Sequence, residues 1–344
     1  MKSTPHMQAR RDFMKSVCAA GTVLAAANFT AGLFPLSAFA ATGHTEQQTR
    51  LLMGTFVTLT ASTADPARAR DAFTLAFKEM ERLIAVFDRH DPGSSLGVLN
   101  AQGTLASPPA ELITVLDAAG RLGAETEFAF NPSIGPVVDL FEQARSGKAP
   151  LPGFGDSALK QALELARPGG VHLEKSVVRL ERSGMRLTLD GIAKGHIADA
   201  ASSVLLRQGI TNHMVNAGGD IRVRGSAATG GPWAIGIQHP TKPGALLDVV
   251  TMGANNAIAT SGSYENYYDR ARSRHHLLNH LTGKSAEAAS VTVRASTAMR
   301  ADALATALAI MPPAEALRYV GSLQGVACLI LDRHGRRYAS PDWA

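Results

Sequence analysis

The stretch Met185-Arg-Leu-Thr-Leu-Asp-Gly-Ile-Ala-Lys-Gly195 decides the fold, and the residues up to Gly225 extend the same unit. Its first five residues alternate apolar and polar side chains, which predicts a half-buried strand that ends at Asp190-Gly191. After Gly195, apolar residues recur at helical spacing, and Gly209 can close that helix; the apolar residues are Ile197, Ala201, Val204 and Leu205. The sequence therefore predicts a strand, a tight turn and a helix.

The turn before this helix suits an anionic ligand such as a phosphate. The first N–H groups of a helix lack partners within the helix, and its dipole is positive there. Lys194 adds a full charge, and the glycines let a ligand approach the backbone closely. Simple chain reversal is the alternative, because the pattern is neither a P-loop nor Gly-x-Gly-x-x-Gly. A short strand at Met214-Val215 then leads to a second turn, Ala217-Gly-Gly-Asp220, and to a strand over residues 221–224.

The chain begins with an export signal. Arg10-Arg-Asp-Phe-Met-Lys15 is a twin-arginine pattern, an alanine-rich apolar run follows it, and Ala38-Phe-Ala40 fits a cleavage site. A membrane anchor is the alternative, but Asn28 and Pro35 interrupt the apolar run. We predict a twin-arginine signal peptide over residues 1–40, a polar connector over residues 41–49, and a mature protein that the twin-arginine machinery delivers to the periplasm.

Composition narrows the class of protein that follows this signal. The formal charge is +5, and the signal carries three of these charges, so nothing indicates binding to nucleic acid. Once Cys18 leaves with the signal, Cys328 has no partner for an internal disulfide. Because no repeat or linker divides the rest, we predict one α+β domain over residues 50–344.

The remaining elements follow from periodicity and from turn-forming residues. Helices are expected from Asp65 to Phe87 and over residues 110–122, and residues 130–139 are expected to form a turn into a short helix. Strands are expected over residues 51–60 and 326–331, within residues 257–268, where a strand ends in small hydroxyl residues, and at the start of residues 290–306, which continue as a connector and a helix. A hairpin of residues 170–180 and 185–189 about a turn at residues 182–184, a polar loop over residues 87–100 and a surface excursion over residues 146–156 complete the prediction.

Two later segments carry candidate chemistry. The run Arg274-His-His-Leu-Leu-Asn-His280 gathers three histidines, but no Cys or His-Glu-x-x-His pattern supports zinc, so either a general base or solvated surface residues are expected. Asp302 and Thr306 lie four apart on a predicted helix, which places a carboxylate and a hydroxyl on one face. Mg²⁺ accepts such oxygen ligands, whereas a helix cap or a solvated charge is the alternative for Asp302.

These segments, in this order from Met53-Gly-Thr55 to Thr306, resemble the ApbE family of FAD:protein FMN transferases. The resemblance implies an α+β domain with an FAD cleft, with Mg²⁺ against the pyrophosphate. It implies transfer of FMN from FAD to a threonine or serine of an acceptor redox protein, with release of AMP.

The resemblance also assigns roles to residues. It implies metal ligands at Gly191, Asp302 and Thr306, with Ala193 as the alternative to Gly191, and a catalytic base at His276. It implies an FAD-binding lining that consists of Met53, His90, Phe130, Asn131, Lys194, Gly219, Asp220, Thr260 and Ser261.

The chain departs from the family pattern at several positions. Where the family has Asp-Leu-Gly-Gly-Ile-Ala-Lys-Gly, this chain has Thr188 for the aspartate and Asp190 for the first glycine. Asp190 could add a metal ligand or repel phosphate. The family's Asp-Pro-Arg becomes Asn279-His-Leu281, which makes His280 a second candidate base.

Two other functions fit the same residues. With water as the nucleophile, the site would be an Mg²⁺-dependent FAD pyrophosphatase that gives FMN and AMP. Without chemistry, the protein would be an FAD-binding carrier. The sequence names neither the acceptor protein nor the oligomeric state.

Overall fold

The computed structural model describes residues 44–264 and 266–343. The predicted signal peptide at residues 1–40 lies outside these residues. Among the described residues, none of the helices combines the length and the apolar character that crossing a bilayer requires.

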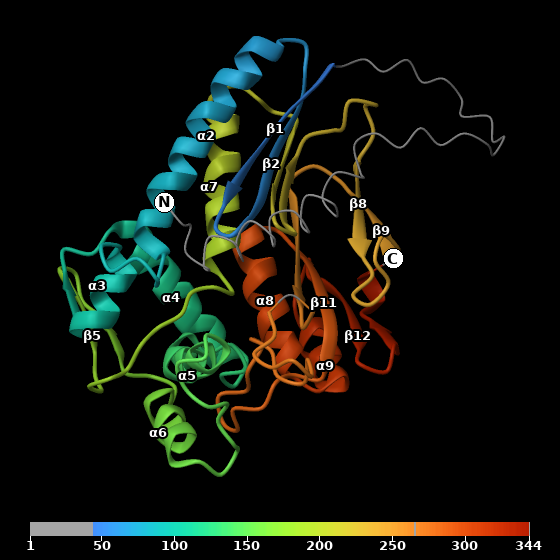
Figure 1. The fold of residues 1–344 in the computed structure, drawn as a ribbon. Coiled ribbons are helices and arrows are strands. Elements are labelled where there is room, and N and C mark those ends of the chain that lie inside the picture. The colour runs from blue at the N-terminus through green and yellow to red at the C-terminus, as the bar shows by residue number, and fades with distance from the viewer. Residues whose placement is uncertain (1–43, 265, 344) are drawn as a thin grey trace, which may run out of the picture. The chain divides into compact units, whose positions relative to one another are not determined.

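An eight-stranded antiparallel sheet forms the centre of the fold, in the order β1-β2-β6-β7-β10-β11-β12-β13 (Figure 1). Its strands are β1 (His44–Leu52), β2 (Thr55–Thr63), β6 (His213–Ala217), β7 (Asp220–Arg224), β10 (Asn256–Gly262), β11 (Ala288–Ala295), β12 (Ala327–Asp332) and β13 (Arg337–Ala339). Neighbours in sequence mostly pair directly, but a long helical excursion separates β2 from its partner β6.

Three helices cover one face of this sheet: α2 (Pro66–Phe87), α7 (Ala193–Arg207) and α8 (Ala298–Ile310). Asp65 caps α2 by accepting a hydrogen bond from the Arg68 N–H, and Thr297 caps α8 in the same way through the Arg300 N–H. The chain leaves α8 at Met311, and Pro313 starts α9 (Pro313–Gly321).

A hairpin of β8 (Trp233–Gln238) and β9 (Leu246–Met252) packs on the other face of the sheet. Its apolar side chains form one cluster with Ile258 of β10, Leu329 of β12 and Trp343. Both faces of the central strands are thus covered. Cys328 on β12 is fully buried and makes no disulfide among the described residues.

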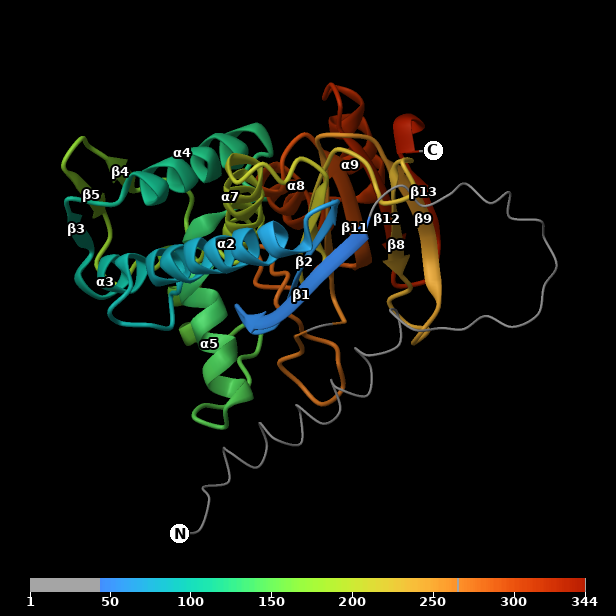
Figure 2. The same cartoon turned by 90° about the horizontal axis from the view of Figure 1, so that it is seen from above.

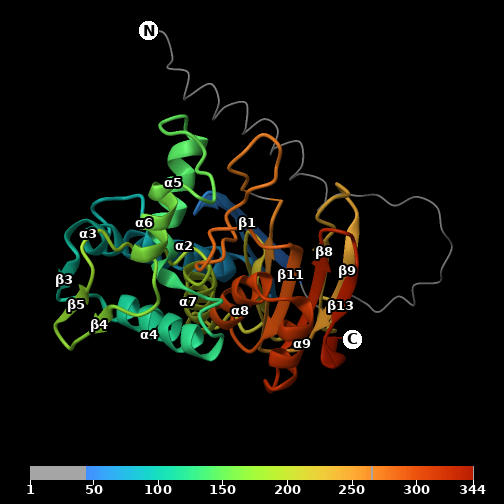
Figure 3. The ribbon, with the colours of Figure 1, turned by 90° about the horizontal axis from the view of Figure 1, so that it is seen from below.

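The excursion between β2 and β6 folds as a group of short elements. It contains α3 (Ser95–Gln102), α4 (Ala110–Glu125), the 3₁₀ turn η1 (Pro132–Ile134), α5 (Gly135–Arg145) and α6 (Ser157–Leu165), with a small sheet of β3 (Thr104–Ala106), β4 (Val171–Leu173) and β5 (Val177–Leu180). Figure 2 shows α3, α4 and α5 on the side of α7 and α8 that faces away from β11 and β12, whereas α9 packs directly on β12. Figure 3 shows α5 beside the connection from β10 to β11. The stacked rings of Phe141 and Tyr268, whose centroids are 5.2 Å apart, join the two segments.

The first strand prediction misses a reversal of the chain. The run over residues 51–60 is not one strand, because Met53 and Gly54 both have positive φ angles, 52° and 72°, and turn β1 back onto β2. The predicted connector over residues 41–49 therefore largely belongs to β1 and pairs along β2.

Two further predictions in the excursion are wrong. The loop over residues 87–100 is polar only up to Ser94, whose hydroxyl accepts the Gly97 N–H and starts α3. The hairpin lies within residues 171–180, as β4 and β5, whereas residues 185–189 form no strand. Their apolar side chains are buried, but Leu187 bonds through both backbone groups to the Asn100 side chain, at 2.7 and 2.9 Å. The alternation of apolar and polar residues over residues 185–189 therefore reflects burial of one side of an extended segment, and not pairing with a neighbouring strand.

Candidate active site

The two helices that carry Lys194, Asp302 and Thr306 of the predicted site hold each other at their amino ends. The Asp302 carboxylate on α8 accepts the Gly195 N–H of α7 at 3.0 Å. In return, the Asp199 carboxylate on α7 accepts the N–H groups of Ala298 and Met299, at 3.0 and 2.9 Å. A Cβ at Gly195 would lie 2.3 Å from the Ala298 carbonyl oxygen, so the close crossing requires glycine there. Sequence reasoning missed Asp199.

The turn before α7 lies against the Thr306 side chain. A Cβ at Gly191 would lie 2.6 Å from Thr306 Oγ1, which shows how close the turn backbone comes to α8. The Ser261 hydroxyl on β10 is 3.3 Å from the same Thr306 oxygen. The structure thus brings Gly191, Thr306 and Ser261 together. Ala193 is already the first residue of α7, where carbonyl groups accept bonds within the helix, so Gly191 is better placed as an outside ligand.

Lys194 and Asp220 form an ion pair beside this group, with 2.9 Å between Nζ and Oδ2. Burial raises the pKa of Asp220, and Lys194 opposes that shift. The pKa of Asp302 is raised well above its usual value, chiefly by burial and then by the Asp220 carboxylate, while Lys194 and the Gly195 N–H lower it. Asp302 is thus buried near a second carboxylate, Asp220, and Lys194 is a neighbouring side-chain cation.

The glycine turn between β6 and β7 approaches the β1–β2 turn. A Cβ at Gly218 would lie 2.5 Å from Thr55 Oγ1, so this glycine fits closely under the Met53-Gly-Thr55 segment. Gly219 has a φ angle of 104° and borders open space, and its N–H donates to the Asn216 side chain. The turn that carries Met53 therefore lies beside the Gly218-Gly219 turn, which leads directly into Asp220 of the ion pair.

His276 lies on the connection between β10 and β11, within electrostatic range of Lys194 and Asp190. Its pKa is lowered to about 4, chiefly by burial and then by His275 and Lys194, while the Asn266 carbonyl and Asp190 raise it. The ring is neutral at pH 7, and its buried Nδ1 has no hydrogen-bond partner among the described residues. Burial alone lowers the pKa of His280. His275 is held by its Nε2, which lies 3.0 Å from the Ala286 carbonyl oxygen.

Four predicted lining residues lie differently. His90 is exposed in the turn after α2, and Phe130 is buried in the main core. The Asn131 side chain is fully used by the fold, since it accepts the Ser133 N–H and donates to the Ala166 carbonyl. Because successive strand residues face opposite ways, Thr260 points away from Ser261 and pairs with the Thr292 hydroxyl at 3.0 Å.

Arg89 is a residue that sequence reasoning missed. Its side chain is only 6% exposed, and it contacts Asp139 and Glu142 of α5 and Asp190 of the central turn. In the sequence it stands in a polar run of turn-forming residues, where nothing marks it as buried.

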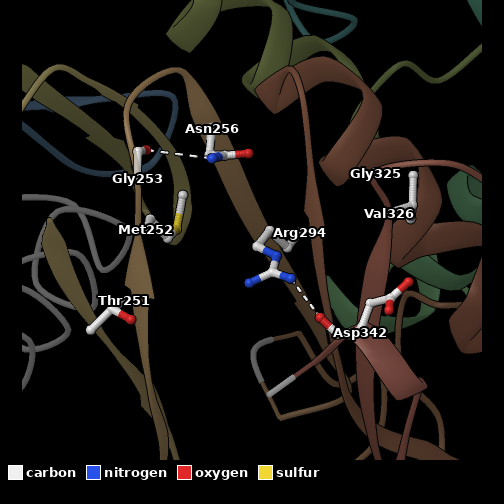
Figure 4. A pocket seen from close by; sticks show the side chains of 8 residues that line it. All are labelled: Thr251, Met252, Gly253, Asn256, Arg294, Gly325, Val326 and Asp342. Carbon is white, nitrogen blue, oxygen red and sulfur yellow. Dashed lines mark hydrogen bonds between the residues drawn. The ribbon is translucent and has the colours of Figure 1, made fainter.

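A cavity of about 270 Å³ lies elsewhere, at the ends of β9, β10 and β11 (Figure 4). Its walls include Asn256, whose amide donates to the Gly253 carbonyl, and Arg294, which donates to the Asp342 carbonyl. Of the residues that line it, none is a predicted site residue. The chemistry therefore gathers at the helix ends and not in this cavity.

Comparisons with known proteins agree with this arrangement. The model of the ApbE family matches residues 53–330. A Vibrio cholerae protein named FAD:protein FMN transferase is 32% identical over 207 residues, which cover 58% of this chain and 61% of that protein. One of the same name from Salmonella typhimurium is 27% identical over 83% of this chain and 84% of its own length.

The solved structure of the flavin transferase ApbE from Vibrio cholerae superposes with a TM-score of 0.76 at 26% identity and covers 88% of this chain and 98% of that one. The match to the family covers the sheet from β2 into β12, the turn before α7, and Asp302 and Thr306 on α8, and on that ground this chain is a member of the ApbE family.

Proposed function

We propose that this protein transfers FMN from FAD to a threonine or serine hydroxyl of a redox protein and releases AMP. The observation that carries this proposal is the meeting of Gly191, Thr306 and Asp302 beside Lys194, with His276 within electrostatic range of Lys194, in a fold of the ApbE family. The name of the relatives, FAD:protein FMN transferase, supports the same activity.

The donor set fits Mg²⁺. Within residues 44–264 and 266–343, no three His, Cys, Asp or Glu side chains gather as a metal site. The group offers instead one carboxylate, one hydroxyl and one backbone carbonyl, and Mg²⁺ typically combines few protein oxygens with water and substrate phosphates. Burial leaves the Asp302 carboxyl with a raised pKa, and a nearby cation would favour its charged form. When bound, the ion would neutralise charge on the pyrophosphate.

The side chains of this protein would bind the phosphates and accept the proton. Lys194 and the amino end of α7 attract the phosphates. Neutral His276 accepts the proton of the acceptor hydroxyl, whose oxygen forms a bond to the phosphorus on the FMN side. The bond from that phosphorus to the bridging oxygen breaks, and AMP leaves with that oxygen. An anionic substrate near His276 raises its pKa from about 4, which makes it a better base in the complex.

The test uses the protein, FAD, Mg²⁺ and a flavin-accepting domain. We expect AMP release together with a gain in the acceptor's intact mass that matches covalent FMN, and loss of both with EDTA or in Asp302→Asn. AMP without a gain in mass would identify a pyrophosphatase instead. FAD binding without either product would leave a carrier.

We further propose that the protein works in the periplasm after twin-arginine export. The Arg10-Arg11 pattern and the Ala38-Phe-Ala40 site support this. Replacing both arginines by lysine should leave the uncleaved chain in the cytoplasmic fraction of a bacterial host. Unchanged cleavage and fractionation would contradict this route.

A further inference from the structure

Arg89 connects three carboxylates that come from two parts of the chain. Nη1 is 3.1 Å from Asp139 Oδ1, Nη2 is 2.6 Å from Glu142 Oε1, and Nε is 2.9 Å from Asp190 Oδ2. Burial lowers the pKa of the guanidinium, but Asp190 and Glu142 more than offset this, so the net shift is upward and the group stays charged. Such a bonded cation holds each carboxylate in place.

The three carboxylates have different neighbours. Asp139 also has Arg186, whose Nε is 2.7 Å from Asp139 Oδ2, so it keeps a cation if Arg89 is lost. Glu142 lies further along α5. Asp190 directly precedes Gly191, and its side chain is 61% exposed on the turn that meets Thr306.

The charge of Asp190 reaches the candidate active site. Asp190 directly precedes Gly191, whose backbone lies against the Thr306 side chain, and its carboxylate also raises the pKa of His276, which places it within electrostatic range of that ring. It also occupies a position where the family pattern has a glycine, with no charge. A carboxylate at this place would repel the pyrophosphate of FAD unless a cation compensated it.

We propose that Arg89 is a positioning residue that holds the Asp190 carboxylate against α5, offsets part of its charge, and so lets the Gly191 turn accept the pyrophosphate of FAD. This inference rests on the proposed function, because it takes FAD as the ligand of that turn. Arg89 itself does not touch the substrate. It acts through Asp190.

The experiment measures FAD affinity by quenching of flavin fluorescence, with Mg²⁺ and separately with EDTA, in a set of matched variants. Arg89→Gln should weaken FAD binding about tenfold, because an uncompensated charge is left beside the phosphates. Adding Asp190→Asn should restore the affinity to within about threefold of the unchanged protein. The loss in Arg89→Gln should also shrink at high salt, because salt screens exposed charges.

The Arg89→Gln, Glu142→Gln double variant distinguishes a purely structural role of Arg89 from its proposed effect on FAD binding. It relieves the unpaired carboxylate on α5, so it should recover thermal stability but not FAD affinity. Equal recovery of affinity by Glu142→Gln and Asp190→Asn would overturn the inference, as would unchanged affinity in Arg89→Gln. If Arg89→Gln alone does not fold, the comparison with and without Asp190→Asn is made in the Glu142→Gln background.

Failure of the proposed function has a different signature. If the unchanged protein binds no FAD, or binds it without ever labelling an acceptor, the function itself is wrong. If the unchanged protein labels an acceptor while Arg89→Gln binds FAD equally well, only the role of Arg89 is wrong.

Discussion

His276 and His280 lie four residues apart, yet their surroundings differ. His276 responds to Lys194 and Asp190, whereas only burial acts on His280. His276 is therefore within electrostatic range of the turn before α7, and no such charge from the described residues acts on His280. The choice between the two bases, which the sequence left open, therefore favours His276.

At this scale we predict that His276→Gln lowers the turnover number for acceptor labelling by about 10²- to 10⁴-fold, the usual contribution of a general base. FAD affinity should change little, because a neutral ring contributes no charge to binding. Stopped reactions followed by intact mass, with a separate FAD titration, measure both quantities. His280→Gln is the matched control, and a larger loss in that variant would move the base to His280.

At the scale of elements, the reciprocal hold between α7 and α8 sets the geometry of the site. Asp302 and Asp199 each accept N–H groups from the other helix, and Gly195 lets the two helices approach. Asp302 thus bonds the first turn of α7 and is also a candidate ligand, whereas the cap of its own helix is Thr297 and not Asp302. One carboxylate can serve both roles because it has two oxygens.

We predict that Gly195→Ala destabilises the protein by about 1–3 kcal/mol, since the new methyl group meets backbone that cannot swing away. Gly120→Ala is the matched control: Gly120 is exposed on α4 with no atom within 4 Å of a new Cβ. There the change should stabilise by about 0.5–1 kcal/mol. Urea unfolding of both variants checks the signs, and a neutral Gly195→Ala would refute the tight crossing.

The sequence predicted elements whose signals are local. The Asp65 cap, the apolar stripe of α2 and the close of α7 near Gly209 were confirmed. Alternation alone could not tell strand β5 from the extended residues 185–189, because both are half-buried and only the hydrogen-bond partner differs. Nor could it indicate Arg89 or Asp199, whose partners lie far away in sequence.

The candidate site shows the same limit. The pair Asp302 and Thr306 follows from helical spacing, and its proximity to Gly191 is visible only in three dimensions. Phe130 and Asn131 stand in a motif that suggested a cleft lining, but their groups are used in the core and in a turn.

At the scale of the whole molecule, buried histidines make stability depend on pH. Burial lowers the pKa of His213 to about 4, and its ring nitrogens lie 2.8 Å from the Ser202 hydroxyl and 2.6 Å from the Ile210 carbonyl oxygen. The unfolded chain binds a proton near pH 6.5 and the folded chain only near pH 4. Stability from this group is therefore present above pH 6.5 and lost as the pH falls toward 4.

We predict that His213→Gln removes about 2–3 kcal/mol of the difference in unfolding free energy between pH 7 and pH 4.5. Asp220 and Asp302, whose pKa values are raised, act in the opposite direction, so the variant is compared with the unchanged protein at each pH. Urea unfolding at both pH values gives the numbers. His334→Gln, on the surface, controls for the substitution itself, and parallel pH profiles for His213→Gln and the unchanged protein would rule the prediction out.

Because Cys328 is buried, the reactivity of its thiol can be used to measure local opening of the fold. Burial raises the pKa of the thiol to about 11, so the reactive thiolate is scarce at neutral pH and shielded on a central strand. In a chain that starts after residue 40 it is the sole cysteine. The rate at which a thiol-directed dye labels such a chain then reports how often β12 separates from its neighbouring strands. A ligand that stabilises the folded domain will lower this labelling rate.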